Sequence, residues 1–316
     1  MHTLPMPTAL ASFPSSARAV GKRAAHNAKR SKKQLKFIDL FAGIGGFHLA
    51  FHRSGAECVF ASEWDEYARR TYEFNHRHIS PDLFKKGNFV GDITQVDPTS
   101  IPDFDVLTGG FPCQPFSQAG FKRGFADTRG TLFFNIVNII DVKRPAAFFI
   151  ENVRHLYAHD DGKTFLTIKK VIEDELGYSF HAKIVKASDY GLPQFRPRLY
   201  MVGFRDKNTP FEFPEPIPLK MTMSDVFGGK CSRKVGYTLR LGGRGSGLND
   251  RRNWDTYVVN NRARRLTSKE GKKMMGFPDN FIFPVSEAQA MRQLGNSVAV
   301  DAVQVVSERI LKAIKR

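Results

Sequence analysis

One of the three cysteines stands where a nucleophile could work. Cys113 lies in the run Gly109-Gly110-Phe111-Pro112-Cys113-Gln114-Pro115-Phe116-Ser117, directly after an apolar stretch at 105–108 that is typical of a strand. A loop at a strand end would present the thiol to a ligand crevice, and a nearby Arg or Lys would lower its pKa. The general alternative for a lone cysteine is a small buried residue. We interpret Cys58 in that way, and Cys231 as an incidental loop thiol.

A carboxylate and two arginines accompany other predicted strands. Glu151-Asn152 ends an apolar run at 146–150, and Gln194-Phe195-Arg196-Pro197-Arg198 leads into another at 198–204. A buried carboxyl in such a place can act as an acid or as a hydrogen-bond donor. Ligands of doubly wound sheets bind beyond the carboxyl ends of the strands, so we expect Glu151 and both arginines at the edge that presents Cys113.

A third group of residues has the pattern of a nucleoside site. The first predicted strand ends in the glycine turn 42–46, the second in Glu63-Trp64, and the next in Gly91-Asp92-Ile93. Such a carboxylate can hold both ribose hydroxyls, Trp64 could stack on an adenine, and Asp92 could accept from its amino group. The spacing is not G-x-G-x-x-G, which favours a nucleoside without a pyrophosphate, such as S-adenosylmethionine. The alternative is that these glycines only make a tight turn.

The elements that must position these groups alternate along the chain. Strands are predicted at 37–41, 58–61, 105–108, 146–150, 179–187 and 198–204, and helices at 47–53, 65–76, 131–142, 163–176 and 299–314. Repeated strand–helix units predict an α/β fold with a parallel, doubly wound, Rossmann-like sheet. Residues 206–230 hold four prolines and indicate a linker. We therefore expect a discontinuous sheet domain with a smaller domain inserted before the last helix.

Length and composition exclude several classes of protein. The chain has 316 residues, 41% hydrophobic and 25% charged, with a net charge of +17. These values exclude wholesale disorder. No apolar run approaches the roughly 18 residues of a membrane span. Three cysteines cannot form a fully paired disulfide framework, which favours a reducing compartment and a cytoplasmic location.

The positive charge is concentrated in two places. Residues 1–36 hold eight basic residues and no acidic one, and residues 220–265, here called the basic segment, hold eleven basic and three acidic residues. The rest of the chain is close to neutral. We interpret the tail as a solvated, disordered extension, with a transit peptide as the alternative. The basic segment is rich in glycine and contains Tyr237, Trp254 and Tyr257, which favours nucleic-acid binding over a merely solvated face.

Six motifs in a fixed order connect these observations. They are Asp39-Leu-Phe-Ala-Gly-Ile-Gly-Gly46, Phe111-Pro-Cys113-Gln-Pro-Phe-Ser117, Glu151-Asn-Val153, Gln194-x-Arg196-x-Arg198, Arg265-Leu-Thr-Ser-Lys-Glu270 through Gly276-Phe-Pro278, and Gly295-Asn-Ser-Val298. From about Lys36 to its end the chain resembles a DNA (cytosine-5)-methyltransferase of the bacterial restriction–modification (type II) family. Residues 1–35 lie outside the resemblance.

The resemblance implies covalent catalysis on a cytosine that is flipped out of the duplex. Cys113 would attack C6, Glu151 would protonate or hydrogen-bond N3, and Arg198 with Arg196 would hold the base and its phosphate. The loop 113–130 would close over the base as a lid. S-adenosylmethionine would be the methyl donor, and no metal is expected.

The resemblance also assigns binding residues. The cofactor site would be formed by Phe41, Gly43, Gly45, Glu63, Trp64, Asp92, Ile93, Asn296 and Ser297. The expected DNA contacts are Ser117, Arg123, Arg240, Arg244, Arg251 and Arg252, with the four last arginines as candidates for guanine. The predicted domains are a tail at 1–35, a catalytic domain at 36–205 and 289–316, and a target-recognition domain at 206–288.

Partners follow from the same reasoning. We expect double-stranded DNA as the substrate, a cognate restriction endonuclease acting separately, no membrane contact, and a monomer. Two alternatives remain: a tRNA cytosine-5 methyltransferase, which would use the same Pro-Cys-Gln loop, and a non-catalytic DNA-binding module. A nicotinamide-dependent dehydrogenase is disfavoured because no catalytic His or Tyr pattern accompanies the glycine turn.

Overall fold

The structure is a computed structural model that describes residues 34–111, 132–242 and 244–315. These described residues all belong to one compact unit. The predicted nucleophile Cys113, the predicted DNA contacts Ser117 and Arg123, and the tail at 1–33 lie outside the described residues.

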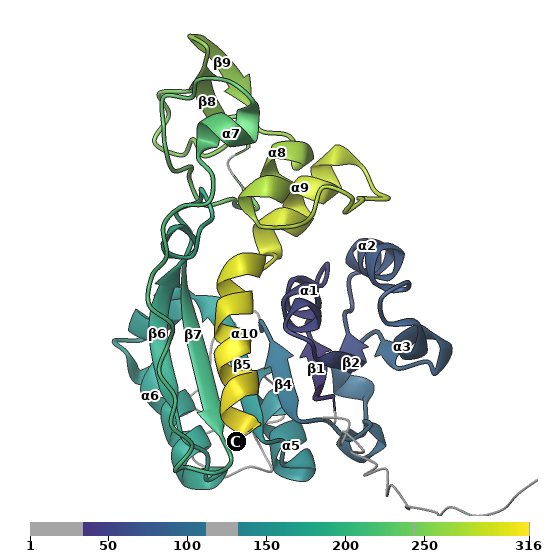
Figure 1. Cartoon of the computed structure of the whole chain (residues 1–316). Coiled ribbons are helices and arrows are strands. Elements are labelled where there is room, and N and C mark those ends of the chain that lie inside the picture. The colour runs from purple at the N-terminus through teal and green to yellow at the C-terminus, as the bar shows by residue number, and fades with distance from the viewer. Residues whose placement is uncertain (1–33, 112–131, 243, 316) are drawn as a thin grey trace, which may run out of the picture. The chain divides into compact units, whose positions relative to one another are not determined.

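A seven-stranded sheet forms the centre of this unit (Figure 1). Its strands are β1 (Lys36–Leu40), β2 (Glu57–Ser62), β3 (Phe89–Val90), β4 (Val106–Gly109), β5 (Ala147–Val153), β6 (His181–Lys186) and β7 (Pro197–Phe204). Their order is β3-β2-β1-β4-β5-β7-β6. The first strand, β1, lies in the middle of the sheet. The next two strands extend the sheet to β3, and the chain then returns past β1 to form the other half. This reversal of direction beside β1 and β4 creates the crevice in which doubly wound sheets bind ligands.

The sheet is parallel, as predicted, except for one strand. β7 runs antiparallel to both of its neighbours, β5 and β6. The connection from β6 to β7 holds only residues 187–196, with one short 3-10 turn, η5 (Ala187–Asp189). A parallel crossover needs a dozen or more residues, usually with a helix, so this connection can only turn the chain back. As a result β7 begins at the edge where the parallel strands end.

Helices cover both faces of the sheet. Successive strand residues point to opposite sides, and apolar residues on both sides are buried against helices. On β5, Phe149 packs in the cluster that includes Phe47 of α1 and Val303 of α10, whereas Phe148 packs in the cluster with Ile136 of α5. Figure 1 shows α10 crossing one face of the sheet. The helices of this part are α1 (Gly46–Arg53), α2 (Glu66–His76), α3 (Pro81–Lys85), α5 (Leu132–Lys143), α6 (Lys163–Lys170) and α10 (Val300–Ile314). The helix predicted at 163–176 is α6 followed by one π-helical turn, η4 (Val171–Glu175).

Residues between β7 and α10 form short elements joined by loops. They are α7 (Met223–Phe227), the antiparallel hairpin of β8 (Thr256–Val259) and β9 (Arg262–Arg265), α8 (Ser268–Met274) and α9 (Glu287–Asn296). The aromatic residues Trp254 and Tyr257 of the basic segment are each 1% exposed. They pack in the same cluster as Leu294 of α9 and Val303 of α10. The basic segment is thus built on its own buried aromatic residues and continues into the core beneath α10.

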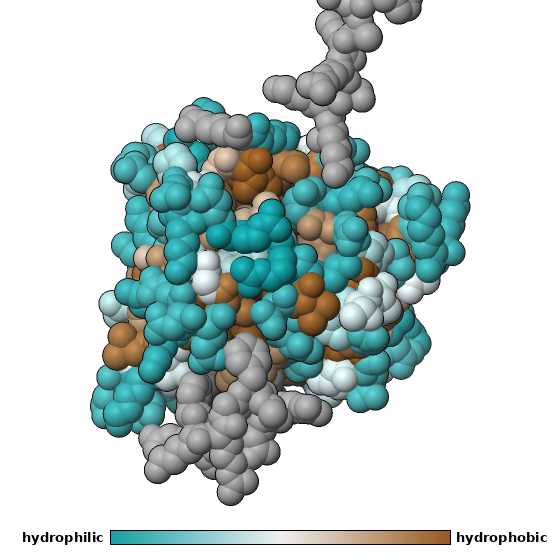
Figure 2. Space-filling model, turned by 90° about the horizontal axis from the view of Figure 1, so that it is seen from below, coloured by the Kyte–Doolittle hydropathy of each residue, from teal (hydrophilic) through white to brown (hydrophobic). Residues whose placement is uncertain are grey.

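One face of the molecule is mostly polar (Figure 2). Figure 2 views the molecule from below Figure 1 and shows a largely hydrophilic face with hydrophobic residues in small, separate groups. Within the described ranges, no helix is both long and apolar enough to span a membrane.

Candidate active site

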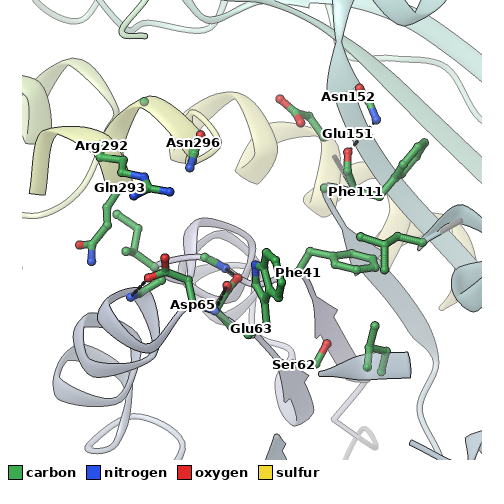
Figure 3. Close-up of a pocket in the computed structure, with 18 of the residues that line it drawn as sticks. Phe41, Ser62, Glu63, Asp65, Phe111, Glu151, Asn152, Arg292, Gln293 and Asn296 are labelled. Carbon is green, nitrogen blue, oxygen red and sulfur yellow. Dashed lines mark hydrogen bonds between the residues drawn. The ribbon is translucent and has the colours of Figure 1, made fainter. Parts of the chain in front are cut away.

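A cavity of about 730 Å³ opens at the edge where β1, β2 and β4 end. Figure 3 shows its two sides, with Phe41, Glu63 and Asp65 on one and Glu151 and Asn152 of β5 on the other. Most of the predicted site residues that the structure describes line this cavity: Phe41, Gly43, Glu63, Trp64, Asp92, Ile93, Glu151, Arg196, Arg198 and Asn296. The structure therefore brings the predicted nucleoside residues and the predicted acid–arginine group into one space.

The glycine turn after β1 is bound to the end of β2. The Gly43 N–H donates to Glu63 Oε2 at 2.7 Å, and the Asp65 N–H donates to Glu63 Oε1 at 2.8 Å. Gly43 has a φ of +56°, which favours glycine, and no atom lies within 4 Å of the position of a Cβ. Burial raises the pKa of Glu63, and the two backbone N–H groups oppose this shift. Each Glu63 oxygen keeps a further lone pair that can accept a hydroxyl of a ligand.

These residues fit a nucleoside. Trp64 is 83% exposed and lines the cavity, so its ring is free to stack on a base. Asp92 and Ile93 follow β3 on the same side, and Phe41 follows β1. The site thus offers a carboxylate for the ribose hydroxyls, aromatic surfaces for the adenine, and a glycine with open space beside it. These features suit S-adenosylmethionine. Among the described residues, no three His, Cys, Asp or Glu side chains are arranged to hold a metal ion.

Two of the predicted cofactor residues lie behind the cavity wall. A Cβ on Gly45 would lie 2.0 Å from His76 Nε2, so the space beside this glycine is filled by the histidine ring. Ser297 accepts at its carbonyl from the Arg196 guanidinium at 2.5 Å. Neither residue belongs to the cavity lining. Their contact with the cofactor stays a prediction. In the structure, Gly45 leaves room for the His76 ring, and the Ser297 carbonyl binds Arg196.

Glu151 and Arg198 form an ion pair at the other side of the cavity. Arg198 Nε lies 3.0 Å from Glu151 Oε1, and the Glu151 residue is 8% exposed. Burial raises the pKa of Glu151, while Arg198 and then Arg196 oppose the shift. Glu151 lies within β5 and not beyond its end, because pairing with β7 extends β5 to Val153, which faces Arg198 in the register. The antiparallel direction of β7 is thus what places Arg198 beside this carboxylate.

Arg196 has a different environment from the one expected. Its guanidinium is buried and donates to three carbonyls: Leu239 at 3.2 Å, Gly295 at 2.9 Å and Ser297 at 2.5 Å. Burial lowers the pKa of Arg196 to about 9, and the neighbouring Arg198 contributes to the shift. We expected this arginine to hold the base and its phosphate. In the structure it joins the start of β7 to the basic segment and to the junction of α9 and α10.

Sequence reasoning missed part of the wall. Arg292 and Gln293 of α9 line the cavity together with the predicted Asn296 (Figure 3). Gln293 Oε1 accepts from Thr71 Oγ1 at 3.0 Å, and its Nε2 has no hydrogen-bond partner among the described residues. Polar residues spaced three and four apart before Asn296 could have indicated this face of the helix.

Comparison with known proteins decides the family. The model of the C-5 cytosine-specific DNA methylase family matches residues 35–240 and 229–312. The type II methyltransferase M.NlaX of Neisseria lactamica is 41% identical over 313 residues, which cover 88% of this chain and 97% of that protein. The type II methyltransferase M.HhaI of Haemophilus parahaemolyticus is 39% identical over 317 residues, covering 87% and 94%. The chain belongs to the C-5 cytosine-specific DNA methylase family.

Solved structures agree with the fold of this methyltransferase. A DNMT2 variant of Spodoptera frugiperda matches with a TM-score of 0.64 at 21% identity, covering 90% of this chain and all of that one. The Entamoeba histolytica methyltransferase EhMeth matches with a TM-score of 0.66 at 18% identity and the same coverage. The predicted fold class, the enzyme class of DNA cytosine-5 methyltransferase and the dependence on S-adenosylmethionine are confirmed.

The four arginines predicted to read DNA differ in what they contact within the methyltransferase. Arg244 Nε lies 3.8 Å from Asp255, and its Nη2 lies 3.4 Å from Glu287. Arg252 pairs with Asp250 at 2.7 Å. Arg240 and Arg251 are exposed, and neither has an ion pair or side-chain hydrogen bond with another described residue. Arg244 and Arg252 thus share their guanidinium groups with carboxylates, and the contact of all four arginines with DNA stays a prediction.

Proposed function

We propose that this methyltransferase is site-specific and transfers its methyl group to C5 of a flipped cytosine through a covalent bond between Cys113 and C6. The observation that carries the proposal is the Glu151–Arg198 pair on the wall of the cavity that Glu63 and Trp64 also line. One cavity can thus hold a target base beside a methyl donor.

The chemistry follows from the groups of the chain. The Cys113 thiolate adds to C6, and Glu151, whose burial favours its protonated form, gives a proton or a hydrogen bond to N3. Arg198 holds Glu151 and offers its remaining N–H groups to the base. These contacts move electron density to C5, which is otherwise a poor nucleophile. S-adenosylmethionine, when bound, supplies the electrophilic methyl group. Loss of the C5 proton then releases the product and restores the Cys113 thiolate.

A mechanism-based substrate tests this proposal. A duplex with 5-fluorocytosine at the target position has no proton to lose at C5, so the adduct should persist on a denaturing gel. The wild type should form the adduct, Cys113→Ser should not, and the control Cys231→Ser should. The absence of a wild-type adduct would refute the covalent step.

The biological role that we propose is protection of host DNA in a restriction–modification system. The similarity to proteins named as type II methyltransferases supports this role. The methyltransferase would act as a cytoplasmic monomer on double-stranded DNA, with residues 206–288 as its recognition domain and a separately acting endonuclease as its counterpart. We expect a short G·C-containing palindrome as its site, because arginine is the side chain that best reads guanine.

Bisulfite sequencing of a plasmid expressed with this protein identifies the site. Methylation confined to one short sequence would support the role, whereas methylation scattered over all cytosines would refute it. Measuring transfer to duplex DNA and to tRNA side by side covers the remaining alternative, since transfer to tRNA alone would overturn the choice of DNA.

A further inference from the structure

The turn between β1 and α1 rests on two buried histidines that belong to none of the motifs. His48 of α1 is 0% exposed and His76, the last residue of α2, is 1% exposed. Their rings are stacked, with centroids 4.3 Å apart and planes 16° apart. Glycine turns of this kind are usually explained by the ligand that they approach. At Gly45 of this turn, the closest described group is instead the His76 side chain.

Among the described residues, the His76 side chain has one hydrogen-bond partner, and that partner belongs to the turn. His76 Nε2 lies 3.0 Å from the carbonyl oxygen of Ile44. A carbonyl can only accept, so Nε2 carries the proton of this hydrogen bond. Burial lowers the pKa of His76 to about 4, which leaves a neutral ring with a single N–H. His76 Nδ1 has no hydrogen-bond partner in the described part of the chain.

The turn is shaped to receive this ring. Gly45 has a φ of +85°, and a Cβ there would lie 2.0 Å from His76 Nε2. The imidazole therefore occupies the space that a side chain of residue 45 would need. Ile44 itself lines the cavity, and its other neighbour Gly43 donates to Glu63.

Other contacts hold the histidine in place. His48 Nδ1 lies 2.6 Å from the Tyr72 hydroxyl and His48 Nε2 lies 2.9 Å from Ser80 Oγ, which fixes the ring against which His76 stacks. At its other end, α2 begins after Asp65, which caps the helix and whose N–H donates to Glu63. The helix thus connects the Glu63 side of the cavity to the underside of the turn.

We propose that His76 is a positioning residue for cofactor binding. Through the Ile44 carbonyl it holds the turn 42–46 in the shape that keeps the Gly43 N–H against Glu63. This inference concerns the cofactor side of the cavity and does not depend on the covalent chemistry of Cys113.

Calorimetric binding of S-adenosylhomocysteine, without DNA, tests the role apart from catalysis. His76→Leu removes the donor at similar volume and leaves a buried carbonyl unpaired, so its Kd should rise about tenfold. His76→Gln keeps an N–H within reach of Ile44 and should bind within about twofold of the wild type, since a donor remains. The exposed His78→Leu is the matched control and should bind like the wild type. In turnover, His76→Leu should raise the KM for S-adenosylmethionine and leave kcat and the Kd for DNA unchanged.

Wild-type affinity in His76→Leu would overturn the proposal. Equal weakening in the leucine and glutamine variants would also overturn it, because the ring and not its N–H would then matter. Should the leucine variant not fold, Gly45→Ala serves as the second variant. It keeps the imidazole and drives it from Ile44, so wild-type affinity in this variant would equally contradict the proposal.

Discussion

Glu151 of β5 and Asp255 of the basic segment are both buried carboxylates with arginine neighbours. Arg198 lies 3.0 Å from Glu151, while Arg265 and Arg244 lie 3.5 Å and 3.8 Å from Asp255. Glu151 lines the cavity. Asp255 is 0% exposed and accepts from the Gly245 N–H at 3.1 Å and from Thr256 Oγ1 at 3.3 Å.

The two carboxylates therefore have different roles. Among the described residues, Glu151 forms one ion pair and has an open side, so a ligand can complete its hydrogen bonds. Asp255 has its oxygens engaged by the loop that precedes it and by its own neighbour in sequence, so it stabilises the conformation of that loop. A buried carboxylate beside arginine indicates a catalytic group only when one side of it faces a cavity.

Replacing Glu151 should have the largest effect and should act on catalysis alone. We expect Glu151→Gln to lower kcat by roughly 10²- to 10⁴-fold, the usual contribution of a general acid. The free energy of unfolding should fall little, because the glutamine side-chain oxygen can still accept a hydrogen bond from the Arg198 guanidinium. Single-turnover methyl transfer and urea unfolding measure the two effects, with the exposed Glu175→Gln as the control.

The role of Glu151 as a proton donor also predicts how kcat depends on pH. Burial raises the pKa of Glu151, and the residue must carry its proton to act on N3. In the wild type kcat should therefore fall as the pH rises through that pKa, and this fall should be absent in Glu151→Gln. A variant that keeps the alkaline fall would assign the proton to another group.

Replacing Asp255 should have the opposite profile. Asp255→Ala leaves the Gly245 N–H and the Thr256 hydroxyl without their partner, which should lower the free energy of unfolding by about 1–3 kcal/mol. The Kd for S-adenosylhomocysteine should not change, because Asp255 does not line the cavity. Urea unfolding and calorimetry test both statements, with Asp250→Ala, which should shift the unfolding midpoint far less, as the control. A loss of cofactor affinity would end the contrast with Glu151.

Two neighbouring arginines sharpen the description of the basic segment. Arg251→Ala should weaken DNA binding and reduce the slope of log affinity against log salt by about one, the loss of one phosphate contact. Arg252→Ala should change the slope less, because this guanidinium is already held by Asp250. Fluorescence anisotropy at several salt concentrations measures both slopes, and equal slopes would show that the Asp250 pair opens on DNA.

Removing residues 1–35 should have the smallest effect on the reaction. These residues are basic and lie outside the family resemblance, so their loss should lower non-specific, salt-sensitive DNA affinity. The methylated sequence should stay the same in bisulfite sequencing. A change in which cytosine is methylated would place the tail within the recognition machinery.

The prediction from sequence succeeded for most of the local elements and for one side of the cavity. Strands are encoded by short apolar runs, and the residues directly after them must reach the carboxyl edge of a parallel sheet, which is why Glu63, Trp64 and Asp92 were found. It failed for Arg292 and Gln293, because the docking of α9 against that edge depends on contacts far apart along the chain. The sequence also did not indicate that the Arg196 guanidinium donates to three carbonyls, because each of these carbonyls lies far from Arg196 along the chain.

The amino-acid sequence by itself determined the family, the methyl donor and the candidates Cys113 and Glu151, because these depend on residue types in a motif order. Only the tertiary structure decided which buried groups face a ligand and which face the protein. The antiparallel direction of β7 places Arg198 beside Glu151. Asp255 is buried and accepts hydrogen bonds from its own loop. His76, at the end of α2, occupies the space that a side chain at Gly45 would need. The physical reason is that local patterns fix the element, while burial and partners depend on which elements the chain brings together.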